Sequence, residues 1–167
     1  MRRNMSKSKS VRVFDYVNHP YKAVREKLTS GETSIFRDAT KVAAARAKSV
    51  ASELHVNFAG IEVGTEISIS VTGVKNDEET ARSGPITRIE LEWEAAKMPR
   101  LFPFMKAELS IYALTDGETQ LDLLGNYVPP FGLLGSAMDA VIGHRIAEAS
   151  VHQFIVDVAA YLRNELS

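Results

Sequence analysis

The C-terminal segment, from about Ser136 to Leu166, is the feature that most constrains the fold. It is rich in alanine and its apolar residues recur at helical spacing, which predicts one helix of roughly 30 residues, about 45 Å long. Before it, apolar and polar residues alternate for most of the chain from Ser49 onward, as they do in strands. An antiparallel sheet with one polar face must cover its apolar face, and only the long helix is large enough.

A strand and two helices are expected before residue 49. One face of the strand VRVFDYV carries Val11, Val13, Asp15 and Val17. A first short helix follows Pro20 and ends before Gly31. The second carries on its apolar face Ile35, Ala39, Val42, Ala43, Ala47 and Val50.

The alternating region predicts five further strands, which makes about six in all. They are SELHVNF, TEISISVTGV, ITRIELEWEAA, FMKAELSIYAL and TQLDLLGNY. The first two form a hairpin, a charged loop KNDEETARSGP follows, and Asp116 with Gly117 makes a later turn. The inward residues include Trp93, Met105 and Tyr127. We therefore expect an α+β fold, with a single domain over residues 11–167 behind a flexible basic leader at 1–10.

Composition excludes several functions. The chain of 167 residues has no cysteine, so it has no disulfides or thiolate nucleophiles. A net charge of -1, with no basic stripe, argues against nucleic acid as a partner. No window approaches the ~18 apolar residues of a membrane span, and no apolar region follows the leader. We expect a cytoplasmic protein without stable membrane insertion, metal or cofactor.

The long predicted helix changes character halfway along. In its second half, Val151, Phe154, Ile155, Val158 and Leu162 share the side that must face the sheet. In its first half that side carries small or polar residues, namely Ala140, His144, Ala147 and Glu148, and Gly143 lies nearby. Because interiors are densely packed, this strip indicates either close helix packing or an unfilled volume. We favour a cavity between the first half of the helix and Trp93, Met105 and Tyr127.

The larger residues of the first half lie on the opposite side of the helix. They are Met138, Ile142 and Ile146. These side chains need a loop or a partner chain as cover, which leaves a homodimer open.

Three polar residues follow one another at i, i+4 spacing on this helix: His144, Glu148 and His152. One metal ion could reach only adjacent members, since the outer two are about 12 Å apart along the axis. The row is interpreted either as an ordinary helix face or as a polar lining for a ligand head group. A catalytic interpretation would use His144, Glu148 or an inward Asp15 for proton transfer, although no nucleophile motif accompanies them.

The amino-acid sequences of several segments resemble those of a known superfamily. The matching pieces are VNHP, LEWEA, FPFMKAELSIYAL and TQLDLLGNYVPPFGLLGSAMDAVIGHRIAEASVHQFIVDVAAYL. They resemble the START-like, helix-grip (SRPBCC) superfamily, most of all its bacterial polyketide cyclase/dehydrase-like branch. The resemblance implies a curved antiparallel sheet gripping the C-terminal helix around an apolar cavity. It implies no shared catalytic residues, because members carry lipids, sterols, polyketides or hormones and many do no chemistry.

The leading expectation is therefore a protein that binds or carries a small hydrophobic molecule, such as a lipid, a sterol or a polyketide-like compound. The residues expected to line its site are Trp93, Met105, Tyr127, Ala140, His144, Ala147, Glu148 and Val151. Two alternatives remain open. One is a polyketide cyclase or dehydratase that uses His144 or Glu148, and the other is an interaction module with a filled core.

Overall fold

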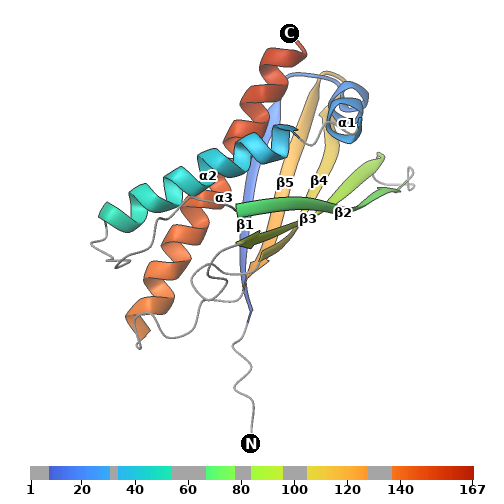
Figure 1. Ribbon diagram of the computed structural model, residues 1–167. Coiled ribbons are helices and arrows are strands. Elements are labelled where there is room, and N and C mark those ends of the chain that lie inside the picture. The colour runs from blue at the N-terminus through green and yellow to red at the C-terminus, as the bar shows by residue number, and fades with distance from the viewer. Residues whose placement is uncertain (1–7, 31–33, 54–66, 78–83, 96–104, 128–136) are drawn as a thin grey trace, which may run out of the picture.

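A five-stranded antiparallel sheet and three helices make up the described part of the chain (Figure 1). The computed structural model describes residues 8–30, 34–53, 67–77, 84–95, 105–127 and 137–167. The strands are β1 (Lys9–Val17), β2 (Ile67–Asp77), β3 (Ile86–Ala95), β4 (Met105–Thr115) and β5 (Glu118–Tyr127). The helices are α1 (Tyr21–Thr29), α2 (Ser34–Glu53) and α3 (Ala137–Glu165).

The strand order is β1-β5-β4-β3-β2, so the first strand pairs with the last and lies at one edge. Leu123 on β5 lies opposite Val13 on β1, and on its other side it lies opposite Leu109 on β4. In Figure 1, α2 and α3 cross on one side of the sheet and α1 lies near one end. This layout is the α+β arrangement expected from the sequence.

The core lies between α3, α2 and one face of the sheet. Residues that alternate along the strands are buried, as period-2 patterning requires. They include Val13, Val17, Ile89, Leu91, Leu109, Ile111, Leu121 and Leu123. Polar atoms within the core are paired: the Trp93 indole nitrogen donates to Thr40, and the Thr40 hydroxyl donates to the Phe36 carbonyl. Burial and pairing together hold α2 on the sheet.

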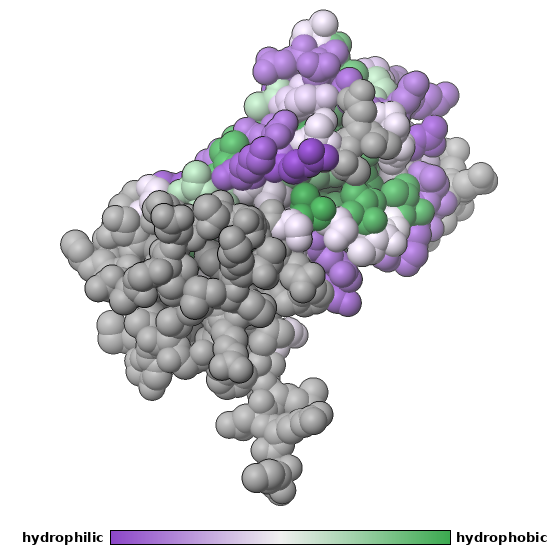
Figure 2. Space-filling view, viewed as in Figure 1, coloured by the Kyte–Doolittle hydropathy of each residue, from purple (hydrophilic) through white to green (hydrophobic). Residues whose placement is uncertain are grey.

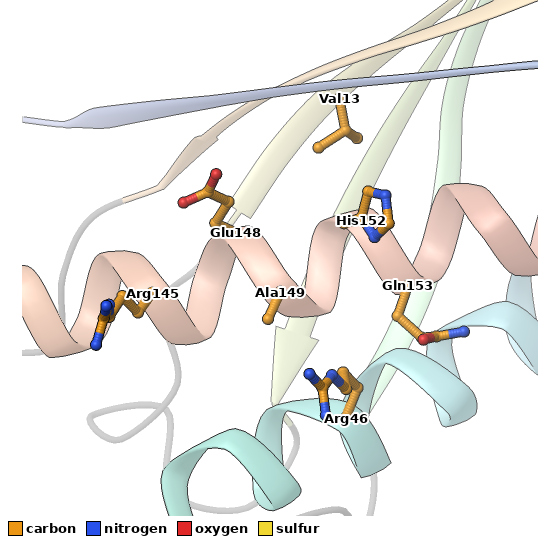
Figure 3. Close-up of a pocket in the computed structure, with 7 residues that line it drawn as sticks. All are labelled: Val13, Arg46, Arg145, Glu148, Ala149, His152 and Gln153. Carbon is orange, nitrogen blue, oxygen red and sulfur yellow. The ribbon is translucent and has the colours of Figure 1, made fainter. Parts of the chain in front are cut away.

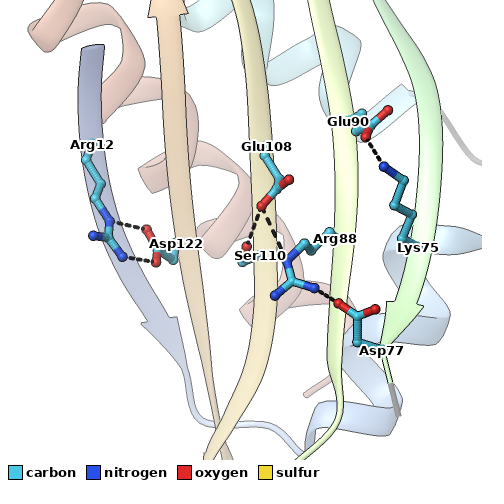
Figure 4. A network of polar contacts seen from close by, with 8 residues as sticks. All are labelled: Arg12, Lys75, Asp77, Arg88, Glu90, Glu108, Ser110 and Asp122. Atoms are coloured by element: carbon cyan, nitrogen blue, oxygen red, sulfur yellow. Dashed lines mark hydrogen bonds and ion pairs between the residues drawn. The ribbon is translucent and has the colours of Figure 1, made fainter.

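The opposite face of the sheet carries charged side chains (Figure 4). Arg12 donates two hydrogen bonds to Asp122 on the neighbouring strand, at 3.0 and 2.7 Å. Lys75 pairs with Glu90 at 2.8 Å, in the same cross-strand manner. Cross-strand pairs of this kind support the register of the sheet, although exposed pairs contribute little individually.

Most elements agree with the sequence prediction, and α3 is a single helix of 29 residues. The predicted start of alternation at Ser49 is wrong, because α2 continues to Glu53 and buries Ala47 and Val50 at helical spacing. Val42, expected on the buried face of that helix, is instead an exposed residue. The rest of the predicted strand at 52–58 lies outside the described residues.

The prediction that a charged loop begins at Lys75 is also wrong at its start. β2 continues to Asp77, where side chains bridge to the next strand. Asn76 accepts a hydrogen bond from Thr87, and Asp77 pairs with Arg88. The charges that suggested a loop are therefore the polar face of a strand.

Candidate functional site

The two halves of α3 differ in their burial. In the second half, side chains that are 2% exposed or less face the sheet and α2: Val151, Phe154, Ile155, Val158, Ala159 and Leu162. In the first half, Val141 is 62% exposed and the His144 side chain is 43% exposed. A Cβ added at Gly143 would meet no other atom within 4 Å. Among the described side chains, the first half is therefore more exposed than the sheet-facing side of the second, although Ala147 is buried in it.

A polar contact joins the first half of α3 to the end of the sheet. Tyr127, the last residue of β5, places its hydroxyl oxygen 2.9 Å from Nδ1 of His144. The two rings stack at 6.3 Å with an angle of 24° between their planes. On the other side of the imidazole, Nε2 lies 4.0 Å from a carboxylate oxygen of Glu148. The sequence-predicted residues Tyr127, His144 and Glu148 are therefore consecutive members of one chain of contacts.

The environment keeps the phenol of Tyr127 in its neutral form. Burial raises the pKa of Tyr127 above its ordinary value of 10.0, and the negative charge of Glu148 raises it further. Both effects disfavour the phenolate. At neutral pH the Tyr127 hydroxyl can therefore donate or relay a proton but does not serve as an anion.

The other residues predicted to line the site do not all lie beside Tyr127 and His144. Trp93 is buried and packs edge-on against Phe154 at 5.1 Å, so it belongs to the tightly packed end. Ala147 and Val151 are buried on α3, and Met105 is half-buried at the start of β4. The side chain of Ala140 lies outside the described residues.

Asp15, a predicted alternative proton-transfer residue, belongs to β1 and lies beside the C-terminal end of α3, away from His144. Its carboxylate pairs with Arg163 near the C-terminal end of α3, at 3.1 Å. The same guanidinium donates to the Tyr16 carbonyl oxygen at 2.5 Å. Asp15 thus takes part in anchoring the end of α3 to the edge strand β1.

An open groove of about 320 Å³ lies along α3, and its composition was only partly foreseen (Figure 3). Its lining consists of Val13, Arg46, Arg145, Glu148, Ala149, His152 and Gln153. The sequence row of His144, Glu148 and His152 pointed to two of these residues. Arg46 was missed because it belongs to α2, and only the tertiary fold brings it to α3. Arg145 was missed because it lies off the row that His144 and Glu148 form on α3.

Apolar residues are also exposed on the inner face of the edge strand β2. Val71 lies opposite buried Leu91, and Val74 lies opposite buried Ile89, yet they are 36% and 44% exposed. Residues directly opposite one another share a face of the sheet. Figure 2 shows apolar surface in the region where Figure 1 places β2. The apolar inner face therefore continues from the core to the surface.

Within the described residues, no three His, Asp or Glu side chains are grouped closely enough to hold a metal ion. Among those same residues, no helix has the length and apolar content needed to cross a membrane.

Comparisons with known proteins identify the fold. No family model matches the sequence, and no curated protein matches it. A crystal structure of TTHA0849 from Thermus thermophilus is similar over 95% of this chain and 100% of that one, with 12% identity and a TM-score of 0.50. The Zhui aromatase/cyclase from Streptomyces sp. R1128 covers 95% of this chain and 93% of its own, with 13% identity and a TM-score of 0.45.

Norcoclaurine synthase from Thalictrum flavum, solved with dopamine and hydroxybenzaldehyde, is similar over 100% of this chain and 95% of its own. The two are 8% identical with a TM-score of 0.47. At these identities the likeness concerns the fold alone. The protein has a helix-grip fold, in which an antiparallel sheet packs against a long C-terminal helix, as the sequence resemblance predicted.

Proposed function

We propose that the protein binds a small hydrophobic molecule between the sheet and the N-terminal half of α3. The observation that carries this proposal is the unequal packing of one continuous helix. The core-facing side chains of its C-terminal half are 2% exposed or less, whereas Gly143 faces open space and His144 is half-exposed. Dense packing is the rule in protein interiors, so loose packing beside an apolar sheet end favours a ligand site.

Two further features support a hydrophobic ligand with a polar group. The exposed inner face at Val71 and Val74 offers apolar surface continuous with the core. Tyr127 and His144 provide a hydroxyl and an imidazole beside the loosely packed half. Burial of apolar area would drive binding at about 25 cal/mol per Å², and the polar pair would orient the molecule.

The proposal is tested with two substitutions at one position. Gly143→Ala improves helix propensity without filling space, whereas Gly143→Leu also fills the volume beside the helix. Both should stabilise the fold, by up to about 1 kcal/mol for the alanine. Only the leucine should weaken binding of the fluorescent probe 1-anilinonaphthalene-8-sulfonate, measured by titration. Equal binding by the two variants would remove this site.

Catalysis is the second candidate, favoured by the contacts from Tyr127 through His144 to Glu148. A carboxylate near Nε2 favours the proton on that nitrogen, which leaves Nδ1 to accept from the Tyr127 hydroxyl. Such a chain could move a proton during cyclisation or dehydration of a poly-ketone. Turnover of poly-ketone mimics by the protein should then fall in His144→Ala, and turnover that is unchanged would exclude this role.

A further inference from the structure

An irregularity in β2 decides which of its side chains face inward. The register of β2 against β3 shifts between Val71 and Gly73, which leaves Thr72 as an extra residue. Residues three apart in a regular strand lie on opposite faces, but the extra residue puts Val74 on the same inner face as Val71. Bulges of this kind re-aim side chains and are frequent next to active sites. Here the bulge places two exposed valines on the apolar face of the sheet.

Asn76 is the next inward residue of β2, and its side chain is fixed by a chain of hydrogen bonds. The Thr87 hydroxyl donates to Oδ1 of Asn76 at 2.8 Å, and the Tyr21 hydroxyl lies 2.6 Å from the Thr87 oxygen. A hydroxyl has one hydrogen, so Thr87 accepts from Tyr21 while it donates to Asn76. The amide oxygen of Asn76 is therefore occupied. Within the described residues, its NH₂ group has no acceptor.

The charged residues of the same strand lie on the other face of the sheet. Lys75 pairs with Glu90 and Asp77 pairs with Arg88, both among the outer side chains of Figure 4. The inner surface of β2 over residues 71–77 thus consists of two exposed valines and one amide donor, without a charge from this strand. Val71, Val74 and Asn76 form what we name the β2 shelf.

We propose that the β2 shelf binds a small apolar molecule that carries an uncharged acceptor oxygen, such as a ketone or ester carbonyl. Val71 and Val74 would cover its apolar part, and burial of that surface would drive binding. The NH₂ group of Asn76 would donate to the oxygen. Two exposed valines offer far less than the ~800 Å² that each partner contributes to a stable protein interface, which favours a small molecule as the occupant.

The polar end of the shelf is separate from the site proposed beside α3. Asn76 lies opposite Thr87, which lies opposite Ile111 on β4. Tyr127 lies opposite Met105 on the same strand. The six residues from Met105 to Ile111 span about 20 Å. A molecule can therefore occupy the shelf whether or not the site beside α3 is filled.

The test is an NMR titration of the full chain with 2-acetylnaphthalene and, separately, with 2-ethylnaphthalene. The two compounds have similar size, but only the first has a carbonyl oxygen. We expect both to cause saturable shifts of the Val71 and Val74 methyl signals. Only 2-acetylnaphthalene should shift the side-chain amide signals of Asn76, because only its oxygen can accept from them.

Asn76→Asp separates the donor from the rest of the shelf. Aspartate keeps an oxygen for the Thr87 hydroxyl but removes the NH₂ group, so binding of 2-acetylnaphthalene should weaken about fivefold. Binding of 2-ethylnaphthalene should stay the same. Asn126→Asp is the matched control, because it adds the same charge at an exposed position on the outer face of β5. Gly143→Leu should leave both titrations unchanged, which distinguishes this site from the one beside α3.

The proposal is overturned if neither compound causes saturable shifts at the two valines. It is also overturned if Asn76→Asp weakens both compounds equally, or if Asn126→Asp weakens 2-acetylnaphthalene as much as Asn76→Asp does. Sedimentation of the unliganded protein tests the other occupant. A dimer in which the valine methyl groups are covered would assign the shelf to a second copy of the chain and overturn the proposal.

Discussion

The C-terminal and N-terminal halves of α3 belong to one helix but have different surroundings. In the C-terminal half, Phe154 stacks with Phe36 at 6.3 Å and meets the edge of Trp93 at 5.1 Å. In the N-terminal half, Val141 is exposed, and His144 meets the sheet through the Tyr127 hydroxyl. Helix formation needs only local hydrogen bonds and one good packing face, so a long helix anchored at one end can leave the other available for binding.

The largest expected effect comes from removing an anchor of the C-terminal half. Phe154→Ala deletes a fully buried ring and should lower the free energy of unfolding by about 3–5 kcal/mol. In the other half, Val141→Ala shortens an exposed side chain and should change it by less than about 0.5 kcal/mol. Chemical denaturation measures both. Similar losses in the two variants would mean that the halves are equally packed.

A smaller effect is expected at the contact between the N-terminal half and the sheet. Tyr127→Phe keeps the buried ring but removes the hydroxyl that meets Nδ1 of His144. Because water can reach the half-exposed imidazole, the loss of stability should be about 1 kcal/mol. ¹⁵N NMR should also show a changed tautomer balance of the His144 ring. An unchanged ring spectrum would argue that the hydrogen bond is not formed in solution.

The smallest effect concerns a carboxyl group in the C-terminal half. Burial raises the pKa of Asp157 above its ordinary value of 3.8, and the charge of Asp38 raises it further. The folded protein then binds this proton more tightly than the unfolded chain does. The contribution of Asp157 to the free energy of unfolding therefore decreases as pH rises through and above 3.8. Asp157→Asn should stabilise the protein at pH 7 by less than about 0.5 kcal/mol.

The sign of the Asp157 effect is checked by denaturation across pH. The advantage of the asparagine should shrink as pH falls below the ordinary carboxyl pKa, because both forms are then uncharged. An advantage that grows toward acid pH would show that the substitution acts by another route.

Much of the fold was predictable because its signals are local. Alternation along β5 and helical spacing in α3 follow from short-range patterning, and both predictions are confirmed. The errors arose where tertiary contacts decided the outcome. Charged Lys75 and Asp77 suggested a loop, but partners on β3 keep them in a strand.

The candidate site was predictable in part for the same reason. Spacing on α3 placed His144 and Glu148 on neighbouring turns, and the structure joins them to Tyr127. No local pattern could place Arg46 in the same groove as Arg145, since the two are 99 positions apart in the sequence. Their common position depends on how α2 crosses α3.

The central claim is that the N-terminal half of α3 is the part that responds to a ligand. Amide hydrogen exchange, followed with and without 1-anilinonaphthalene-8-sulfonate, tests it most directly. Without the probe, amides around His144 should exchange faster than those around Ile155. With the probe, protection should increase around His144 while exchange around Ile155 stays the same. Equal exchange in the two halves, or protection that increases only outside the N-terminal half, would contradict the account.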